Sequence, residues 1–412
     1  MKLLYIHQNF VTAEGSGITR PYDLTQHLAR MGHDVTVICG LYDRSGLPPA
    51  PSWTMYSLQR VGAVRVVVCN VRYSNKMNLR ERLWALMGFA LLATVAALRQ
   101  RKPDVIFASS PTLESTIGGV IASYVHRVPY VFEVRDLWPE DIVDGGRIKR
   151  GGVVHRFQSF LEWLSYRTAS RILLVSRGFH DRLLERGYAD RLLETIMLGG
   201  DGPLFEQVGP DEAFVRELGL AGKFLAIYAG AHGTANGLGQ VLDAAEYLKD
   251  RPDIALVLVG DGKERQDLLR QVEQRGLTNV HMVGSMPKMR IPGVLAACHV
   301  GLLVLTQIFR PRWVTPNKLF DYMFAGLPTI VNFAGTSAQF VEAEHAGQAS
   351  APGSAQDLAA KIRYYADHPV QRDATGRHAR QLARDRYDRR AIAEQMAAVF
   401  ETVRAGRPRR TD

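Results

Sequence analysis

The chain has 412 residues, of which 46% are apolar and 22% are charged, and it carries a formal net charge of +10. This length is about twice that of a usual single domain, so we expect two domains that each bury a core. The composition excludes a largely disordered chain. The cysteines Cys39, Cys69 and Cys298 are far apart and lack metal-ligand spacing, which predicts buried thiols in a reducing compartment such as the cytoplasm.

Apolar runs of strand length alternate with helical patterns through the first half of the chain. The N-terminal run, MKLLYIHQNF, is followed by no further apolar stretch or cleavage site, so it predicts a first strand and not a signal peptide. The repeated alternation of strand and helix predicts a parallel sheet. The expected strands are residues 3–6, 35–38, 64–68, 105–108, 130–134 and 172–175.

An apolar segment, residues 83–98, is bracketed by basic side chains. As a helix its 16 residues would be about 24 Å long, short of the roughly 30 Å hydrocarbon core of a bilayer, so it is not expected to span a membrane. Two interpretations remain open: a buried packing helix with solvated ends, and a helix that lies on an anionic lipid surface. The bracketing residues are Arg72, Lys76, Arg80, Arg82, Arg99, Arg101 and Lys102.

The stretch LGGDGPLF, residues 198–205, breaks both periodicities and predicts a hinge. Strands then recur at residues 224–228, 254–259, 280–283, 300–305 and 329–331, which predicts a second doubly wound half. We expect domains at residues 1–200 and 201–385, followed by a C-terminal helix and basic tail at 386–412. A solvated tail and packing of this segment on the N-terminal domain are both open. The ligand crevices of two such halves should face each other across a cleft.

The segment TPNKLFDYMFAGLP, residues 315–328, contains the clearest group of candidate ligand-binding residues. Thr315 is expected to cap a helix whose first residue is Pro316. The amides of Asn317 and Lys318 would then lie in the open first turn, which with the lysine charge predicts an anion site. Asp321 shares their face and could accept hydrogen bonds from a ribose. The alternative is an ordinary capped helix.

In each half of the chain, one glycine-bearing loop follows the first strand. Residues 13–20 include Gly15 and Gly17, where backbone can approach a ligand closely, although the third glycine of a dinucleotide fingerprint is missing. Residues 229–239 carry His232 within the turn, for which a satisfied loop histidine is the alternative.

Charged residues also end the buried strand at residues 130–134, in the motif FEVRDLWPEDIVDGG. Burial of charged side chains costs free energy, so Glu133, Arg135 and Asp136 are expected there only if they serve a function or are paired. A functional group at the crevice is the favoured interpretation, and a structural salt bridge is the alternative. Trp138 and Pro139 are expected to brace the loop.

Taken in order, these motifs resemble those of the family 4 glycosyltransferases with the GT-B fold, and within them the bacterial amino-deoxysugar transferases of polysaccharide assembly. The resemblance runs essentially end to end, through HQNF with its glycine loop, FEVRDLWPE, LGGDGPLF, YAGAHGTANGL, LVGDG and TPNKLFDYMFAGLP. It implies an α/β GT-B architecture, two Rossmann-like domains with parallel sheets facing across a cleft. It also implies retaining transfer, with the nucleotide sugar bound by the C-terminal domain and the acceptor bound mainly by the N-terminal domain.

The resemblance assigns roles to particular residues and implies no metal or other cofactor. No Asp-x-Asp motif occurs to hold a cation against a diphosphate, so the helix dipole and basic side chains must replace it. The catalytic candidates are Glu133, Arg135, Asp136 and Lys318. The acceptor-binding candidates are Arg20, Glu133 and Trp138. The donor-binding candidates are Gly15, Gly17, His232, Gly260, Asp261, Gly284, Arg312, Pro316, Asn317, Lys318 and Asp321.

The chain departs from the family pattern at charged positions. Two glutamates eight positions apart are replaced by Trp313 and Asp321, and Trp313 cannot hydrogen-bond the donor sugar as a carboxylate would. The usual arginine and lysine near the second-domain glycine loop are missing, with His232 and Asn236 nearby instead. The candidates to supply the charge are Lys318, Arg310 and Arg312.

The resemblance suggests a UDP-linked N-acetylated deoxyhexose, of the fucosamine or quinovosamine type, as the donor and a polyprenyl-diphosphate-linked sugar as the acceptor. It places the protein in the cytoplasm, with attachment to the inner face of the cell membrane as an option. A nucleotide-sugar epimerase of the same architecture is one alternative. The other is a non-catalytic anion-binding or nucleic-acid-binding protein, although no basic stripe with interleaved aromatics is present, so nucleic acid is not an expected partner.

Overall fold

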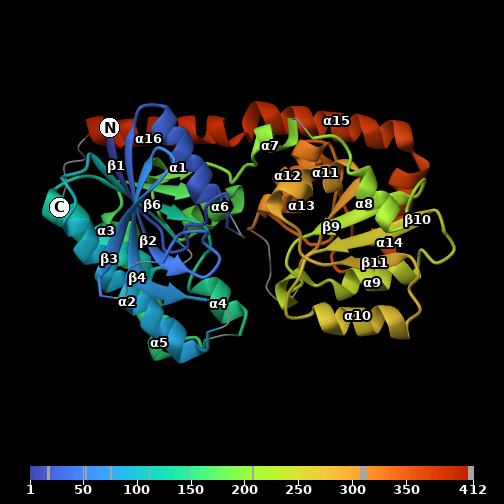
Figure 1. Cartoon of the computed structure of the whole chain (residues 1–412), viewed down its shortest axis with the longest axis horizontal. Coiled ribbons are helices and arrows are strands. Elements are labelled where there is room, and N and C mark those ends of the chain that lie inside the picture. Colours follow the sequence, from blue (N-terminus) through green and yellow to red (C-terminus); the bar gives the residue numbers. More distant parts are fainter. Residues whose placement is uncertain are drawn as a thin grey trace. The chain divides into compact units, whose positions relative to one another are not determined.

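The computed structural model describes residues 1–15, 19–49, 51, 53–74, 77–110, 112–146, 148–206, 208–306 and 313–406, with the backbone alone described at Leu79. The chain forms two compact units (Figure 1). Unit 1 comprises Met1–Met197 and Arg389–Asp412, and unit 2 comprises Leu198–Asp388. The last helix therefore belongs to unit 1, where the chain began.

Unit 1 is built on an eight-stranded sheet with the order β3-β4-β2-β1-β5-β6-β7-β8. Its neighbours pair in parallel except β3 and β4, which form an antiparallel hairpin at the edge. The predicted parallel sheet is confirmed, whereas β3 and the short β8 were not predicted because they carry too few apolar residues. The strands are β1 Lys2–Ile6, β2 Asp34–Tyr42, β3 Tyr56–Val61, β4 Val64–Tyr73, β5 Val105–Ser109, β6 Tyr130–Val134, β7 Arg171–Leu174 and β8 Leu193–Thr195.

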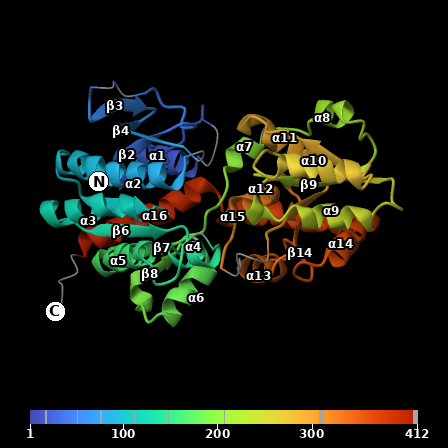
Figure 2. The ribbon, with the colours of Figure 1, turned by 90° about the horizontal axis from the view of Figure 1, so that it is seen from below.

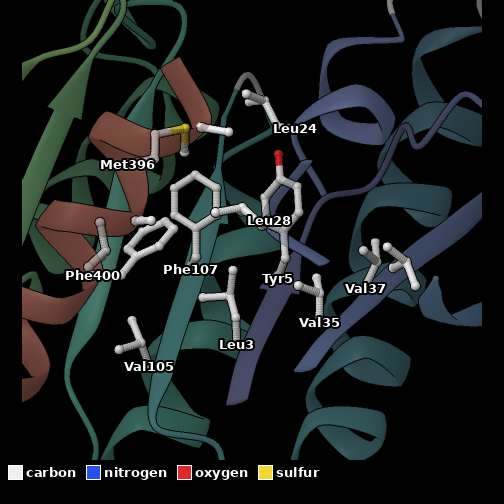
Figure 3. Close-up of a cluster of buried hydrophobic side chains, with 14 of the residues drawn as sticks. Leu3, Tyr5, Leu24, Leu28, Val35, Val37, Val105, Phe107, Met396 and Phe400 are labelled. Atoms are coloured by element: carbon white, nitrogen blue, oxygen red, sulfur yellow. The ribbon is translucent and has the colours of Figure 1, made fainter. Parts of the chain in front are cut away.

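Helices cover both faces of this sheet. On one face, α1 (Arg20–Arg30) and α16 (Arg389–Ala405) pack on the strands, and Figure 3 shows Met396 and Phe400 of α16 beside Phe107 and Tyr5. The rings of Phe107 and Phe400 have centroids 5.2 Å apart. The remaining helices of unit 1 are α2 Leu79–Leu98, α3 Glu114–His126, α4 Glu140–Asp144, α5 Val153–Thr168 and α6 Arg177–Glu185, with a 3-10 turn at Asp190–Leu192.

Helix α2 is longer than expected. It spans 20 residues, about 30 Å, because Asn78 and Glu81 form a capping box that starts it before the apolar run. Among the described residues it is the one helix long and apolar enough to cross a bilayer by length and composition. The expectation that this helix is too short to span a membrane is therefore wrong. One of its faces nevertheless packs inside unit 1, where Phe89 and Ala93 are fully buried.

Unit 2 contains a six-stranded parallel sheet with the order β11-β10-β9-β12-β13-β14. The order reverses between β9 and β12, and ligands of doubly wound sheets bind beyond the carboxyl ends of the strands at this switch point. The strands are β9 Phe224–Ala229, β10 Ile254–Val259, β11 Val280–Val283, β12 Val300–Leu303, β13 Thr329–Val331 and β14 Gly347–Ala349. The helices are α7 Gly202–Glu206, α8 Glu212–Glu217, α9 Gly239–Glu246, α10 Arg265–Gln274, α11 Ile291–Ala296, α12 Asn317–Ala325, α13 Thr336–Ala343, α14 Ala355–Asp367 and α15 Pro369–Arg386.

The two chain segments that join the units pair with each other. Gly200 forms an isolated parallel bridge with Asp388, and the Gly202 amide donates to the Asp388 carboxylate at 3.2 Å. A side chain on Gly200 would collide with the Phe324 ring, since its Cβ would lie 2.6 Å from a ring carbon. The glycines of the predicted hinge therefore permit close packing on unit 2.

Candidate active site

Helix α12 begins at Asn317, one residue later than expected. Pro316 is the N-cap, with φ −65° and ψ 148°, and no described side chain caps the helix. The prediction that Thr315 caps a helix starting at Pro316 is wrong, because the extended ψ of Pro316 excludes it from the helix. The first backbone N–H groups of α12 therefore have no partner within the helix, and the positive end of its dipole can attract an anion.

Lys318 brings a cation to this helix start. Its ammonium lies 4.0 Å from the centre of the Tyr228 ring and donates to the Tyr228 hydroxyl at 2.8 Å. It also donates to Oδ1 of Asn236 at 3.5 Å. Burial lowers the pKa of Lys318 to about 7, although Asp321 acts in the opposite direction. A bound anion would favour the charged ammonium, so this lysine is poised to change protonation state on binding.

Glycines allow the loops after β9 and β10 to pack beside Lys318. A Cβ on Gly230 would lie 2.8 Å from the lysine Nζ. Gly260 has φ +141°, and its Cβ would lie 1.8 Å from the Gly230 carbonyl oxygen. A side chain at either position would collide with the protein itself, so glycine at both positions lets the two loops and Lys318 pack closely together at the carboxyl ends of the strands.

His232 and Asp261 help to shape these loops. The His232 side chain is fully buried, and its amide donates to the Asp261 carbonyl at 3.0 Å. Burial and the Arg265 guanidinium lower the pKa of His232, so the ring is neutral near pH 7. The Asp261 carboxylate accepts from the Gly262 amide at 2.8 Å. For both residues the structure gives a loop-forming role. Among the described residues, neither ring nitrogen of His232 has a hydrogen-bond partner, so the ring is not the satisfied loop histidine that the sequence left open.

Asp321 lies one turn after the start of α12 in a cluster of charges. Burial raises the pKa of Asp321 to about 6, Asp201 also raises it, and Lys288 and Lys318 lower it. The Lys288 ammonium lies 4.0 Å from the Asp201 carboxylate. Sequence reasoning missed Lys288, although its place after a predicted parallel strand was an available signal. Gly284 starts the same loop and faces open space, because a Cβ there would meet nothing within 4 Å.

In unit 1, Glu133 and Arg20 form a buried ion pair. Their side chains are 1% and 0% exposed, with Nη1 of Arg20 2.7 Å from Oε1 of Glu133. Ser109 donates to the other carboxylate oxygen at 2.6 Å. Burial raises the pKa of Glu133, but Arg20 and Arg135 outweigh it and the net pKa is lowered. This geometry corresponds to the structural salt bridge that the sequence left open, and it leaves neither side chain exposed to an acceptor.

Arg135 and Asp136 are more accessible, since both are half-buried beyond the end of β6. The Arg135 amide donates to the Ser110 hydroxyl at 2.8 Å, and its guanidinium lies 3.5 Å from Nε2 of His7. Burial, followed by the charge of Arg135, lowers the pKa of His7 to about 3. His7 was not singled out from the sequence, although the HQNF motif that contains it follows the first strand and therefore reaches the same sheet edge.

A pair of carboxyl groups shares this loop. Burial raises the pKa of Asp136 to about 6, against the effect of Arg135. Burial and Asp136 raise the pKa of Asp141, which the sequence analysis missed, to about 7. The Asp141 carboxylate accepts from the Leu137 amide at 2.8 Å, and the Trp138 amide donates to the Asp136 carbonyl at 3.0 Å. Trp138 thus belongs to the turn that holds Asp136.

At Gly15, the glycine loop after β1 does not provide the space for a ligand that was expected from the sequence. A Cβ on Gly15 would lie 2.5 Å from the Arg44 carbonyl oxygen and 2.7 Å from that of Ser45. Protein backbone therefore fills the space beside Gly15 that had been expected to receive a ligand. Three further candidates lie outside the described residues: Gly17, Arg310 and Arg312.

The predicted residues thus gather in two groups, one in each unit. Asn317, Lys318 and Asp321 meet the glycine loops of unit 2, and Arg135 and Asp136 lie at the carboxyl edge of the unit 1 sheet. Within the described ranges, no group of three or more His, Cys, Asp or Glu side chains is arranged to hold a metal ion.

Comparison with known proteins assigns the chain to a family. Residues 16–199 match the glycosyl transferase 4-like domain, and residues 211–382 match the glycosyl transferases group 1. The chain is 26% identical over 343 residues to WcaI of Escherichia coli (strain K12), named as a glycosyl transferase of colanic acid biosynthesis, covering 79% of this chain and 82% of WcaI.

Solved structures share the fold over nearly the whole chain. HepE of Anabaena, solved in complex with UDP, has a TM-score of 0.71 at 20% identity, covering 98% of this chain and 100% of HepE. Sucrose-phosphate synthase of Thermosynechococcus elongatus has a TM-score of 0.75 at 17% identity, covering 98% and 99% of the two chains. The expected enzyme class and architecture are confirmed. The protein belongs to the family 4 glycosyltransferases with the GT-B fold.

Proposed function

We propose that the enzyme transfers an N-acetylated deoxyhexose from a UDP-linked donor to a lipid-linked saccharide, with retention of configuration and without a metal ion. The observation that carries the proposal is the half-buried Lys318 ammonium beside the uncapped start of α12. The fold relative HepE has been solved with UDP and with UDP-glucose, which supports UDP as the carrier. The sugar is inferred from the family resemblance.

The donor diphosphate would lie between Lys318 and the glycine loops of unit 2. As the bond between sugar and phosphate breaks, negative charge grows on the leaving oxygen, and the lysine with the first amides of α12 would stabilise it. Asp321 would accept hydrogen bonds from the ribose hydroxyls. These groups need no reorganisation during the reaction, because backbone and packed side chains already hold them in place.

The donor sugar would meet an aromatic side chain where the family has a carboxylate. Trp313 is half-buried and lies four residues before α12. An indole ring offers apolar contact and no acceptor for a sugar hydroxyl. This supports a donor with methyl and acetyl groups, which benefit from apolar contact more than a fully hydroxylated hexose does.

The acceptor would be oriented by unit 1. Arg135 and Asp136 are half-buried polar groups at its sheet edge, where Asp136 can accept a hydrogen bond from the attacking hydroxyl. The hydroxyl would attack from the face that the diphosphate leaves and pass its proton to the departing phosphate oxygen, so no protein nucleophile is required. A polyprenyl-diphosphate-linked acceptor would place this step at the cytoplasmic face of a membrane.

Calorimetric binding of UDP, GDP and UDP-sugars to the wild type, Lys318→Ala and Asp321→Ala tests the donor site. We expect micromolar binding of UDP compounds that both variants weaken at least tenfold. Lys249→Ala is the matched control, because Lys249 is exposed and its ammonium donates to the Arg275 carbonyl. Preferential binding of GDP would contradict UDP as the carrier. Wild-type affinity in both variants would contradict the site.

Product analysis tests the chemistry. With UDP-N-acetylfucosamine, UDP-N-acetylquinovosamine and a polyprenyl-linked acceptor, we expect an α-glycoside from an α-linked donor and full activity in EDTA. Inactivation by EDTA would contradict the metal-free mechanism. Conversion of the UDP-sugar into its epimer without any acceptor would identify an epimerase instead.

A further inference from the structure

The outer surface of α2 is unusually apolar for a helix at the edge of a unit. Trp84 is 80% exposed and Leu91 is 65% exposed, and Met87 lies between them with 43% of its surface accessible. These residues are spaced by three and four positions, so their side chains form one stripe along the helix. The opposite side of α2 packs on β4 and α3, so both sides of this helix are apolar.

The apolar surface continues over two neighbouring helices. Helix α3 packs against α2 on one side and α5 on the other, as Figure 2 shows. The α2–α3 approach is close, since a Cβ on Gly118 would lie 3.2 Å from the Thr94 amide nitrogen. On α3, Tyr124 and Val125 are exposed, and on α5 the Phe160 and Trp163 rings are exposed and stacked 5.9 Å apart.

Isolated exposed apolar residues are normal, but a patch that extends over three adjacent helices indicates an interaction surface. We refer to the exposed side of α2, α3 and α5 as the three-helix face. It is rich in large aromatic side chains, which cost little conformational entropy when they are ordered in an interface.

The exposed charges of the three-helix face are mainly positive. Exposed basic residues lie on these helices or directly after them: Arg80, Arg99, Arg101, Arg127, Arg156 and Arg167. The helices contain three carboxylates, and each is engaged within the protein. Glu81 completes the capping box of α2, Glu114 accepts from Gln158 at 2.5 Å, and Glu162 pairs with Arg186 at 2.7 Å.

From this combination we infer that the three-helix face docks on an anionic phospholipid bilayer. Tryptophan and tyrosine favour the boundary between headgroups and acyl chains, and arginines attract anionic headgroups. A second copy of the chain fits less well, because a twofold interface would oppose like charges. The inference rests on the proposed function for its purpose, since a docked unit 1 would meet a lipid-linked acceptor where it resides.

Vesicle flotation with the full chain tests the surface. We expect binding to vesicles of 30% phosphatidylglycerol in phosphatidylcholine that exceeds binding to pure phosphatidylcholine at least tenfold and weakens with added salt. The double variant Trp84→Ser, Trp163→Ser should lose at least tenfold in partition coefficient. Trp53→Ser is the matched control, because Trp53 is 85% exposed but lies outside the three-helix face. Thermal unfolding and calorimetric UDP binding should be unchanged in all variants.

Several outcomes would overturn the inference: equal binding to both vesicle types, unchanged binding of the double variant, or equal losses in the double variant and Trp53→Ser. Sedimentation velocity provides a further check. A wild-type dimer that the double variant dissociates would assign the face to a second copy instead. Because UDP binding is measured separately, a wild-type protein that binds UDP but not the anionic vesicles would refute the docking surface alone. Vesicle binding without UDP binding would refute the proposed donor site alone.

Discussion

The pKa of Lys318 makes donor binding depend on pH in a calculable way. Burial lowers this pKa to about 7, against the effect of Asp321. In the free protein the side chain is then about half protonated at pH 7 and about one hundredth protonated at pH 9. A bound diphosphate favours the ammonium and raises the pKa, so binding at pH 9 must take up a proton.

The size of the effect follows from these populations. If binding requires the ammonium, Kd for a UDP-sugar rises about 50-fold between pH 7 and pH 9, equivalent to about 2.3 kcal/mol. Proton uptake rises from about 0.5 to about 1 per donor bound. A UDP-sugar is preferable to UDP, because its diphosphate has no titration in this range. Calorimetry in buffers with different ionisation enthalpies measures both Kd and proton uptake.

Variants connect this behaviour to the lysine. Lys318→Met keeps the aliphatic stem but removes the charge, so it should bind weakly and without proton uptake at either pH. Lys249→Met should behave as the wild type. Equal wild-type affinity at pH 7 and pH 9 with no proton uptake would refute the reasoning, because it would show that the Lys318 ammonium does not contact the diphosphate.

Three further predictions concern other positions. Because burial raises the pKa of Asp321 to about 6, donor binding should weaken as the pH falls below 6 and this carboxylate is protonated, and Asp321→Asn should abolish the acid dependence in the same calorimetric assay. Gly260→Ala should lower stability by about 2 kcal/mol or more in urea unfolding, since its Cβ would collide with backbone, whereas Gly284→Ala, which faces open space, should have little effect. Arg20→Ala should cost about 3–5 kcal/mol by leaving the buried Glu133 unpaired, and a stable but inactive Arg20→Ala would indicate that the pair acts in catalysis instead.

Local sequence spacing says more about the candidate donor site than about the candidate acceptor site. Asn317, Lys318 and Asp321 lie within two turns of one helix, so local spacing placed them on one face. Glu133 was harder to interpret, because its partner Arg20 is distant in sequence and nothing local shows that both are buried together. The Thr315 cap was wrong for a related reason: the composition fits a cap, but the backbone angle at Pro316 sets the helix start.

By itself the sequence determined the two doubly wound sheets and the helix that starts near Pro316, because the alternation of apolar residues reflects backbone geometry that repeats over a few residues. Only the tertiary structure decided the electrostatics. It brought Lys318 to Tyr228, 90 positions away, and returned α16 to unit 1, where Arg389 pairs with Asp23. Burial and charge proximity set a pKa, and both depend on contacts between distant segments that local periodicity does not encode.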